Sequence, residues 1–356
     1  MQQKRYIEKQ IDAALSLRND GFLSHRSVHQ RFERTLRLSV LLCLAFSFTR
    51  LYGQTLWQPS AGHTQVSIWP TGVPDPRPTD GPETSQRTGA RDLVADKPWI
   101  SVERVSKPTM TVYSPQGTNT GTAVIVFPGG GYEILAIDLE GTEACDWLVA
   151  RGITCVLLKY RVPALRSAPY WGSYPQSSMA LEDAQRTMGL VRARAKEWHI
   201  DPGKIGVLGF SAGGHLVAAL SVHFDKRLYP AIDSADQFSC RPDFAIALYP
   251  GHLSVKRGTL MLNTDIASRV TARTPPTFLL QNEDDAVDSI WDSLSYYAAL
   301  KTHGVPVEFH SYAKGGHGFG LRPTDSASTG WPRIAERWLV TIGMLSAHEL
   351  PSADVQ

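Results

Sequence analysis

One stretch near the middle of the chain constrains the fold more than any other. Residues 207–214 read Val-Leu-Gly-Phe-Ser-Ala-Gly-Gly, which is the pattern Gly-x-Ser-x-Gly centred on Ser211. A short apolar run precedes it, as in a buried strand, and a helix-forming run follows from His215. A serine on such a tight strand-to-helix turn has an exposed hydroxyl, and glycines are needed where the two backbone arms approach each other. We therefore expect Ser211 to be a nucleophile; the alternative is a glycine-rich turn that only joins a strand to a helix.

Apolar runs and amphipathic segments alternate from residue 99 onward, which is typical of a mostly parallel sheet with helices on both faces. Residues 122–127 are apolar throughout, as expected of a central parallel strand, whereas 109–113 alternates like an antiparallel strand. We expect strands at 109–113, 122–127, 154–160, 205–210, 244–249, 277–281 and 307–312, and helices at 140–151, 179–198, 289–303 and 334–345.

The charge of the chain is unevenly distributed. Residues 1–53 hold nine Lys and Arg against four Asp and Glu, whereas the remainder holds 27 basic and 30 acidic residues. The remainder therefore has no general positive field, and we expect neither nucleic acid nor an anionic membrane surface as a partner. The composition does not indicate an oligomeric state.

The N-terminal segment resembles a targeting sequence. An apolar run of eleven residues at 38–48 follows a long basic stretch; it is too short to span a bilayer as a helix. It fits the core of a signal peptide, with cleavage after Gly53, so we expect an exported protein, periplasmic or secreted, without a stable membrane span. An uncleaved anchor, a start codon placed too far upstream and a cytoplasmic protein are the alternatives.

Composition also sets the expected domain boundaries. Residues 54–98 are rich in Pro, Gly, Thr and Asp and cannot form long helices, so they are either an extended arm on the domain or a partly disordered linker. We expect a catalytic domain at 99–346 and a short tail at 347–356. The segments 223–243 and 251–275 are too short for a large helical cap, so any lid should be small.

The four cysteines do not have the spacing of a metal site. Cys43 lies in the apolar run, and Cys240 is expected to be a small buried apolar residue. The same holds for Cys145 and Cys155, for which a disulfide bond is the alternative. We expect no metal and no organic cofactor.

A nucleophilic serine needs a base, and His317 is the best placed of the eleven histidines. It lies in Gly-Gly-His-Gly-Phe-Gly (315–320), directly after the last expected strand. The flanking glycines allow this loop to fold over the nucleophile and bring the imidazole within hydrogen-bond distance.

The base in turn needs a carboxylate that holds its tautomer. The strand at 277–281 ends in a cluster of acidic residues, and the end of a parallel strand is where such a group belongs. We predict Asp285, with Asp284 as the alternative; Glu283 and Asp288 are the other acids of the cluster. The order serine, acid, histidine is the order expected of this type of fold.

A reaction at a carbonyl also needs donors for the developing oxyanion. Residues 127–132 read Phe-Pro-Gly-Gly-Gly-Tyr directly after an apolar strand. Backbone N–H groups of Gly130 and Gly131 can point at an oxyanion, together with the N–H of Ala212. The alternatives are a plain glycine turn or a phosphate-binding loop, but no phosphate-loop or dinucleotide-binding motif follows this strand.

These motifs resemble the acetyl esterase and acetylxylan-esterase-like branch of the α/β-hydrolase superfamily over roughly residues 66–344. The resemblance implies an α/β-hydrolase fold and removal of short acyl groups, often from plant polysaccharide. Asn282 and Asp288 depart from the pattern, since many relatives have a small residue and a proline there. The matching segments are 68–70, 128–132, 140–141, 160–161, 209–214, 284–287 and 316–319.

We therefore expect a serine carboxylic-ester hydrolase whose partner is a small ester or an acetylated carbohydrate. A peptidase of the prolyl-oligopeptidase type uses the same order of residues, but those proteins usually carry a large propeller domain for which this chain has no room. A non-catalytic binding protein on the same scaffold is the second alternative. The aromatic residues expected to contact substrate are Tyr132, Tyr170, Trp171 and Phe319.

Overall fold

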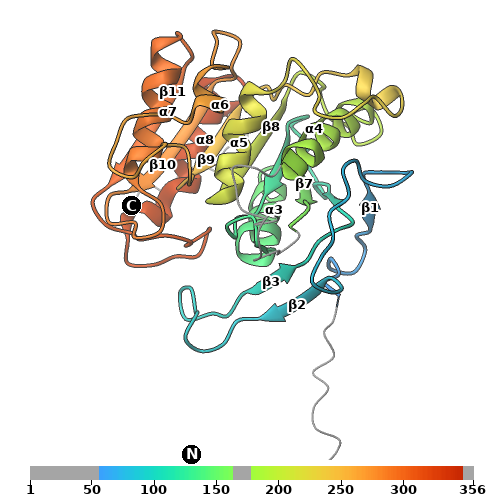
Figure 1. Ribbon diagram of the computed structural model, residues 1–356, viewed down its shortest axis with the longest axis horizontal. Coiled ribbons are helices and arrows are strands. Elements are labelled where there is room, and N and C mark those ends of the chain that lie inside the picture. Colours follow the sequence, from blue (N-terminus) through green and yellow to red (C-terminus); the bar gives the residue numbers. More distant parts are fainter. Residues whose placement is uncertain (1–55, 163–177, 348–356) are drawn as a thin grey trace, which may run out of the picture. The chain divides into compact units, whose positions relative to one another are not determined.

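The computed structural model describes residues 56–162 and 178–347 (Figure 1). Its main feature is an eight-stranded sheet in the order β1-β4-β7-β5-β8-β9-β10-β11. β1 and β4 are antiparallel, as are β4 and β7, and all other neighbours are parallel. The strands are β1 (Gln65–Ser67), β4 (Thr109–Tyr113), β5 (Ala123–Phe127), β7 (Thr154–Lys159), β8 (Ile205–Phe210), β9 (Ala245–Leu248), β10 (Thr277–Asn282) and β11 (Val307–Tyr312).

Helices cover the sheet on both faces, since every residue of β5, β7, β8, β9 and β10 is buried. α4 and α5 pack against each other (Figure 1), and α3 and α8 meet through Trp147 and Trp331, whose ring centroids are 5.1 Å apart. The α-helices are α3 (Glu143–Val149), α4 (Ser178–Ala193), α5 (Ala212–Val222), α6 (Thr264–Ala267), α7 (Ile290–Thr302) and α8 (Trp331–Thr341).

Three helices differ from the predicted boundaries. The helix predicted at 179–198 is α4, which ends at Ala193 because residues 194–199 form turns instead of a further helical segment. The helix expected from Glu140 begins with a π-helical turn (Asp138–Thr142), in which the N–H of Thr142 donates to Ile137. α8 begins at Trp331, earlier than predicted, because Pro332 lies in its first turn, where proline costs no hydrogen bond. Short 3₁₀ turns lie at Ser234–Gln237 and Ala327–Gly330.

The arm before residue 99 is built into the domain. Its strand β1 extends the main sheet, and Trp69 donates a hydrogen bond of 2.8 Å to the buried carboxylate of Asp183. A second, antiparallel sheet of three strands joins the arm to the loop after β5 (Figure 1 shows β2 and β3 side by side). Its strands are β2 (Thr84–Arg87), β3 (Ile100–Glu103) and β6 (Ile134–Ala136).

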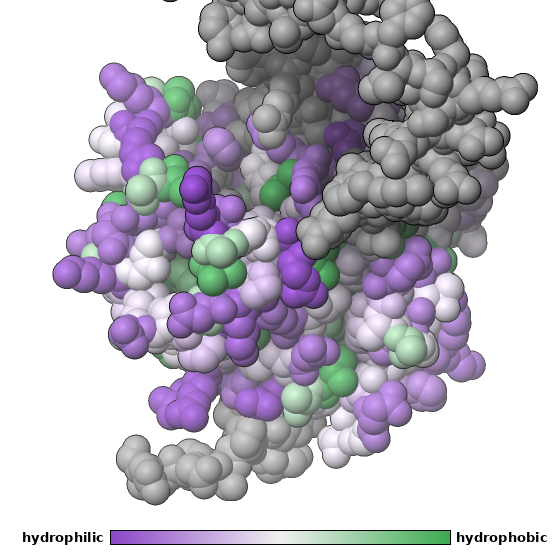
Figure 2. All heavy atoms as spheres, turned by 90° about the horizontal axis from the view of Figure 1, so that it is seen from below, coloured by the Kyte–Doolittle hydropathy of each residue, from purple (hydrophilic) through white to green (hydrophobic). Residues whose placement is uncertain are grey.

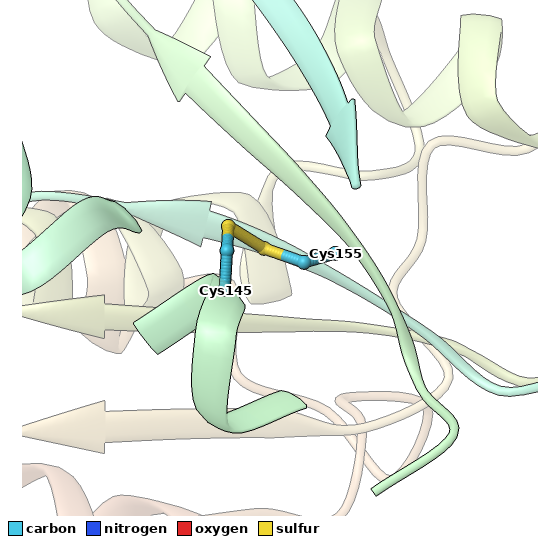
Figure 3. The surroundings of a disulfide bond; sticks show 2 residues. All are labelled: Cys145 and Cys155. Atoms are coloured by element: carbon cyan, nitrogen blue, oxygen red, sulfur yellow. A yellow bond between two sulfur atoms is a disulfide. The ribbon is translucent and has the colours of Figure 1, made fainter. Parts of the chain in front are cut away.

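Cys145 of α3 and Cys155 of β7 form a disulfide bond (Figure 3). The prediction of two separate buried thiols is therefore wrong, and the alternative, a disulfide bond, is correct. Cys240 is a free, buried thiol, as predicted.

The surface seen in Figure 2 is mostly hydrophilic, with apolar residues in small separate groups. Scattered apolar residues of this kind are normal for a globular protein. Within the described residues, no helix is both long enough and apolar enough to cross a bilayer.

Candidate active site

Ser211 lies on the turn between β8 and α5, in a backbone conformation that residues other than glycine rarely adopt (φ 53°, ψ −120°). The turn is possible because Gly209 and Gly213 lie against each other: a Cβ atom on Gly209 would collide with the carbonyl of Gly213. The serine hydroxyl therefore stands at the carboxyl end of the central strands, as the Gly-x-Ser-x-Gly pattern predicts.

The structure brings Ser211, His317 and Asp285 together in a chain of hydrogen bonds. His317 Nε2 is 2.9 Å from Ser211 Oγ, and His317 Nδ1 is 2.6 Å from Asp285 Oδ2. An imidazole between a hydroxyl and a carboxylate can take the hydroxyl proton and generate a nucleophile.

The carboxylate of Asp285 is buried and held from several directions. Its Oδ2 accepts a hydrogen bond of 2.9 Å from the Gln281 side chain, and its Oδ1 accepts the N–H groups of Val287 and Asp288 at 2.8 and 2.9 Å. These bonds leave Asp285 one orientation, in which it faces the imidazole of His317.

Asp284, the alternative acid, has a different place. Its Oδ1 accepts the backbone N–H groups of Gly315 and Gly316 at 2.9 and 2.8 Å, while Asn282 donates 2.9 Å to the carbonyl of Gly316. Asp284 and Asn282 thus hold the loop that carries His317, and Asp285 alone of the two aspartates contacts the imidazole. The contact of Asn282 with Gly316 could not be predicted from the sequence, in which Asn282 is notable only because it departs from the family pattern.

The glycine loop after β5 lies beside Ser211. Gly130 and Gly131 both have positive φ (127° and 64°), and both line the same pocket as Ser211. Ala212, whose N–H is the third predicted donor, is the first residue of α5. The neighbouring Gly129 donates its N–H to Glu140 Oε2 at 2.8 Å, so Gly129 serves to hold the loop.

Glu140 is a site residue that sequence reasoning missed, although it lies in one of the matching segments. Its Oε1 accepts the hydroxyl of Tyr249 at 2.8 Å, and that hydroxyl accepts the N–H of Gly320 at 3.0 Å. Burial raises the pKa of Glu140, although the bonds from Tyr249 and Gly129 and the nearby His317 act in the opposite direction. Glu140 therefore joins the glycine loop to the loop that follows His317.

Asp288 also lies beside the reacting atoms, which the sequence did not predict. Its Oδ2 is 3.4 Å from Ser211 Oγ and 3.7 Å from His317 Nε2. Burial raises the pKa of Asp288, and the negative charge of Asp285 adds to this, whereas the positive charge of His317 lowers it.

The carboxylates around His317 also act on the imidazole. Burial disfavours the charged ring, but the hydrogen bond with Asp285 and its negative charge oppose burial. Asp288 and Glu140 add to this effect, so the net result is a raised pKa for His317.

A pocket of about 350 Å³ opens onto Ser211. One side, the strand-end wall, comes from the loops after the parallel strands and consists of Gly130, Gly131, Ser211, Val287, His317 and Gly318. We count with it the carboxylates of Asp285 and Asp288, which do not line the pocket but contact His317. The other side, the arm wall, consists of Asp92, Leu93, Val94 and Trp99. Ala136, Leu139 and Glu140 complete the lining.

Of the four aromatic residues expected to contact substrate, the two that the structure describes, Tyr132 and Phe319, do not line this pocket. Tyr132 is buried and its hydroxyl is 2.7 Å from His215 Nδ1, and Phe319 packs in the core against Tyr249. Tyr170 and Trp171 lie outside the described residues. Among those that are described, no cluster of His, Cys, Asp and Glu could hold a metal ion.

Comparison with known proteins places this site in a family. The family model BD-FAE matches residues 110–248. The crystal structure of an acetyl ester-xyloside bifunctional hydrolase from Caldicellulosiruptor lactoaceticus is 30% identical, with a TM-score of 0.61; the match covers 79% of this chain and 97% of that one. The chain belongs to the esterase family of α/β-hydrolases. The predicted fold class and family resemblance are thereby confirmed.

Curated relatives agree with this family. An acetylxylan esterase from Xylanibacter ruminicola is 28% identical over 237 residues, 64% of this chain and 47% of that protein. Endo-1,4-beta-xylanase B from Butyrivibrio fibrisolvens is 31% identical over 223 residues, 58% of this chain and 34% of that protein. The chain thus matches about half of the first relative and a third of the second.

Proposed function

We propose that the protein is a serine carboxylic-ester hydrolase that removes acetyl and other short acyl groups, from acetylated carbohydrate such as xylan in particular. The observation that carries this proposal is the chain of hydrogen bonds from Ser211 through His317 to Asp285. The family, and the relatives named as esterases of acetylated xylan, support the same chemistry.

The geometry supports a two-step reaction. His317 takes the proton of Ser211 as the serine oxygen attacks the ester carbonyl, and Asp285 stabilises the imidazolium that forms. N–H groups of Gly130, Gly131 and Ala212 stabilise the oxyanion. His317 then gives its proton to the leaving alcohol, and water activated by the same imidazole releases the acid from the acyl-enzyme.

The size of the pocket favours small acyl groups. A volume of about 350 Å³ lies at the low end of small-molecule pockets and must also admit part of the alcohol. Each CH₂ group contributes about 0.8 kcal/mol only where it leaves water, so acyl chains that extend beyond the pocket gain nothing. We expect kcat/KM to be highest for acetate to butyrate esters and to fall steeply by octanoate.

The two alternative functions predict different activities. A peptidase of the prolyl-oligopeptidase type would cleave peptide anilides, and a binding protein would hydrolyse neither these nor esters. We expect hydrolysis of p-nitrophenyl acetate and release of acetate from acetylated xylan, with no cleavage of proline anilides. Esterase activity confined to octanoate or longer chains would contradict the proposed substrate class.

We further propose that the protein is exported. The disulfide between Cys145 and Cys155 supports this, because such bonds persist in oxidising compartments. Mass spectrometry of the protein from its host should find an N-terminus near Gln54 in the periplasmic or extracellular fraction. A cytoplasmic protein that retains Met1 would contradict export.

A further inference from the structure

Asp288 places a second carboxyl group at the reacting atoms. Asp285 faces Nδ1 of the imidazole, whereas Asp288 Oδ2 faces Nε2, at 3.7 Å, and the hydroxyl of Ser211, at 3.4 Å. Nε2 is the atom that delivers a proton to the leaving alcohol in the proposed reaction. Asp288 is therefore on the side of the imidazole where the alcohol part of the substrate departs.

The position of this carboxyl group is built into the loop between β10 and α7. The backbone N–H of Asp288 donates 2.9 Å to Asp285 Oδ1, and its carbonyl accepts 3.3 Å from the side chain of Gln281. Gly251 lies directly against the carboxyl oxygens, where any Cβ atom would collide with them. Asp288 is only 7% exposed, so its carboxyl group does not swing out into solvent.

Besides His317 and Asp285, two charged groups on neighbouring elements act on Asp288, namely Asp292 and His252. Asp292, on the first turn of α7, is committed to the backbone and side chain of Ser254 and to the N–H of Ser289. The charge of His252, on the loop after β9, lowers the pKa of Asp288, whereas the charges of Asp285 and Asp292 raise it. In the part of the chain that the structure describes, the close polar contacts of the Asp288 side chain are thus to Ser211 and His317.

The contact between Asp288 and the Ser211 hydroxyl is unfavourable for catalysis unless a substrate group occupies the Asp288 carboxyl group. A serine hydroxyl that donates to Asp288 does not donate to His317, and only the latter bond activates the nucleophile. A hydroxyl group of the substrate that bonded Asp288 would remove this competition. In a sugar monoacetate, the free hydroxyl next to the ester oxygen lies beside the leaving oxygen, and the leaving oxygen must approach His317 Nε2, the atom that Asp288 Oδ2 faces.

We propose that Asp288 is a specificity-determining residue that hydrogen-bonds the hydroxyl group adjacent to the scissile ester, so that the enzyme selects monoacetates of vicinal diols such as those of sugars. The inference rests on the proposed ester hydrolysis and names the substrate class for it. Either protonation state of the carboxyl group can serve, since the carboxylate accepts from a hydroxyl and the acid can also donate to one.

The test compares two esters that differ by one hydroxyl. The monoacetate of vicinal trans-cyclohexanediol carries the adjacent hydroxyl, and migration of its acetyl group regenerates the same compound; cyclohexyl acetate lacks the hydroxyl. We expect the wild-type kcat/KM for the diol monoacetate to exceed that for cyclohexyl acetate by about 10- to 100-fold, as for a hydrogen bond to a charged group.

The same ratio is then measured in variants. Asp288→Ala should bring the ratio close to one, and Asp288→Asn, which keeps one acceptor oxygen, should give an intermediate ratio. Glu283→Gln, an exposed acid of the same loop, should keep the wild-type ratio. Circular dichroism establishes that each variant is folded.

The outcomes separate the two proposals. If p-nitrophenyl acetate is not hydrolysed, the proposed function fails. If it is hydrolysed but the wild-type ratio is near one, the assignment of Asp288 is overturned, whether or not its variants fold. A high ratio that Asp288→Ala leaves unchanged overturns it equally, since another group must then bind the hydroxyl.

Discussion

The two walls of the pocket are built by different means. On the strand-end wall, each functional side chain follows a parallel strand by a few residues and is fixed by several hydrogen bonds, as Asp285 is by Gln281 and Val287. The arm wall contributes mainly apolar side chains, of which Leu93 is 40% exposed. From this contrast we expect the strand-end wall to carry the chemistry and, through Asp288, to select the alcohol part of the ester, and the arm wall to limit the size of the acyl group.

The arm wall is nonetheless attached to the elements that carry the chemistry. Arg322, on the loop beyond His317, donates 2.7 Å to the carbonyl of Lys97 and 2.6 Å to Glu143 Oε1. The N–H of Ile100 donates 2.7 Å to Asp138. Strand β2 of the arm pairs with β3, and β3 pairs with β6, which directly follows the glycine loop, so the arm and the glycine loop share one small sheet.

The largest effect is expected where the strand-end wall is broken at Asp285. Asp285→Asn should lower kcat/KM for p-nitrophenyl acetate by on the order of 10⁴-fold, because the imidazole loses its orienting carboxylate. Asp284→Asn should lower the same kcat/KM by only about 10-fold, since this change weakens the hydrogen bonds to the loop at Gly315 and Gly316 and leaves Asp285 in place. The reverse order would mean that Asp284 is the acid that supports the base.

A smaller loss is expected at Glu140, which supports the strand-end wall through Gly129 and Tyr249. Glu140→Ala leaves the N–H of Gly129 and the hydroxyl of Tyr249 without their acceptor, and the glycine loop should shift. We expect kcat for p-nitrophenyl acetate to fall by about 10²-fold, comparable to the loss of one oxyanion donor, with a smaller change in KM. Tyr249→Phe, which removes only the hydroxyl, should cost less; an unchanged kcat in Glu140→Ala would exclude a positioning role.

The pH profile tests the carboxylates of the strand-end wall. Only neutral imidazole accepts the serine proton, so kcat/KM should fall as the pH drops through the pKa of His317. Because that pKa is raised, the fall should be centred above about 6.5, the ordinary value. Asp288→Asn removes one negative charge beside the ring and should move the acid limb to lower pH. A limb that stays in place would mean that Asp288 does not act on His317.

The smallest effect is expected on the arm wall, and on selectivity alone. Leu93→Ala should lower the preference for butyrate over acetate by a factor of about four, the value of one CH₂ group that no longer leaves water. Leu228→Ala, an exposed leucine of similar exposure away from the pocket, is the matched control. An equal loss for both esters would place Leu93 among the residues that support the chemistry.

The difference between the walls also explains which parts of the structure could be predicted from the sequence. The boundaries of the strands at 109–113, 205–210 and 307–312 agree with β4, β8 and β11, because alternating or continuous apolar runs report burial directly. The glycines around Ser211 and His317 are required by tight turns, so Ser211 and His317 could be identified from the local sequence. The choice between Asp285 and Asp284 needed the structure, in which Asp285 contacts His317 and Asp284 contacts the backbone of Gly315 and Gly316.

What depends on tertiary contacts could not be predicted. Strand β2 (Thr-Ser-Gln-Arg) has no apolar pattern, and β3 and β6 are only four and three residues long, so this sheet becomes evident only when the arm pairs with the loop after β5. The ring of Tyr132 is aimed inward at His215, which no spacing reveals. Asp288 looks like any other acid of a loop until the fold brings it to His317.

The most direct test of the account is to trap the nucleophile. A fluorophosphonate reacts with an activated serine and forms a stable covalent adduct that mass spectrometry locates on a peptide. We expect one adduct per chain, at Ser211, a parallel loss of esterase activity, and neither labelling nor activity in Ser211→Ala. Labelling at another serine, or hydrolysis of p-nitrophenyl acetate by Ser211→Ala at close to the wild-type rate, would contradict it.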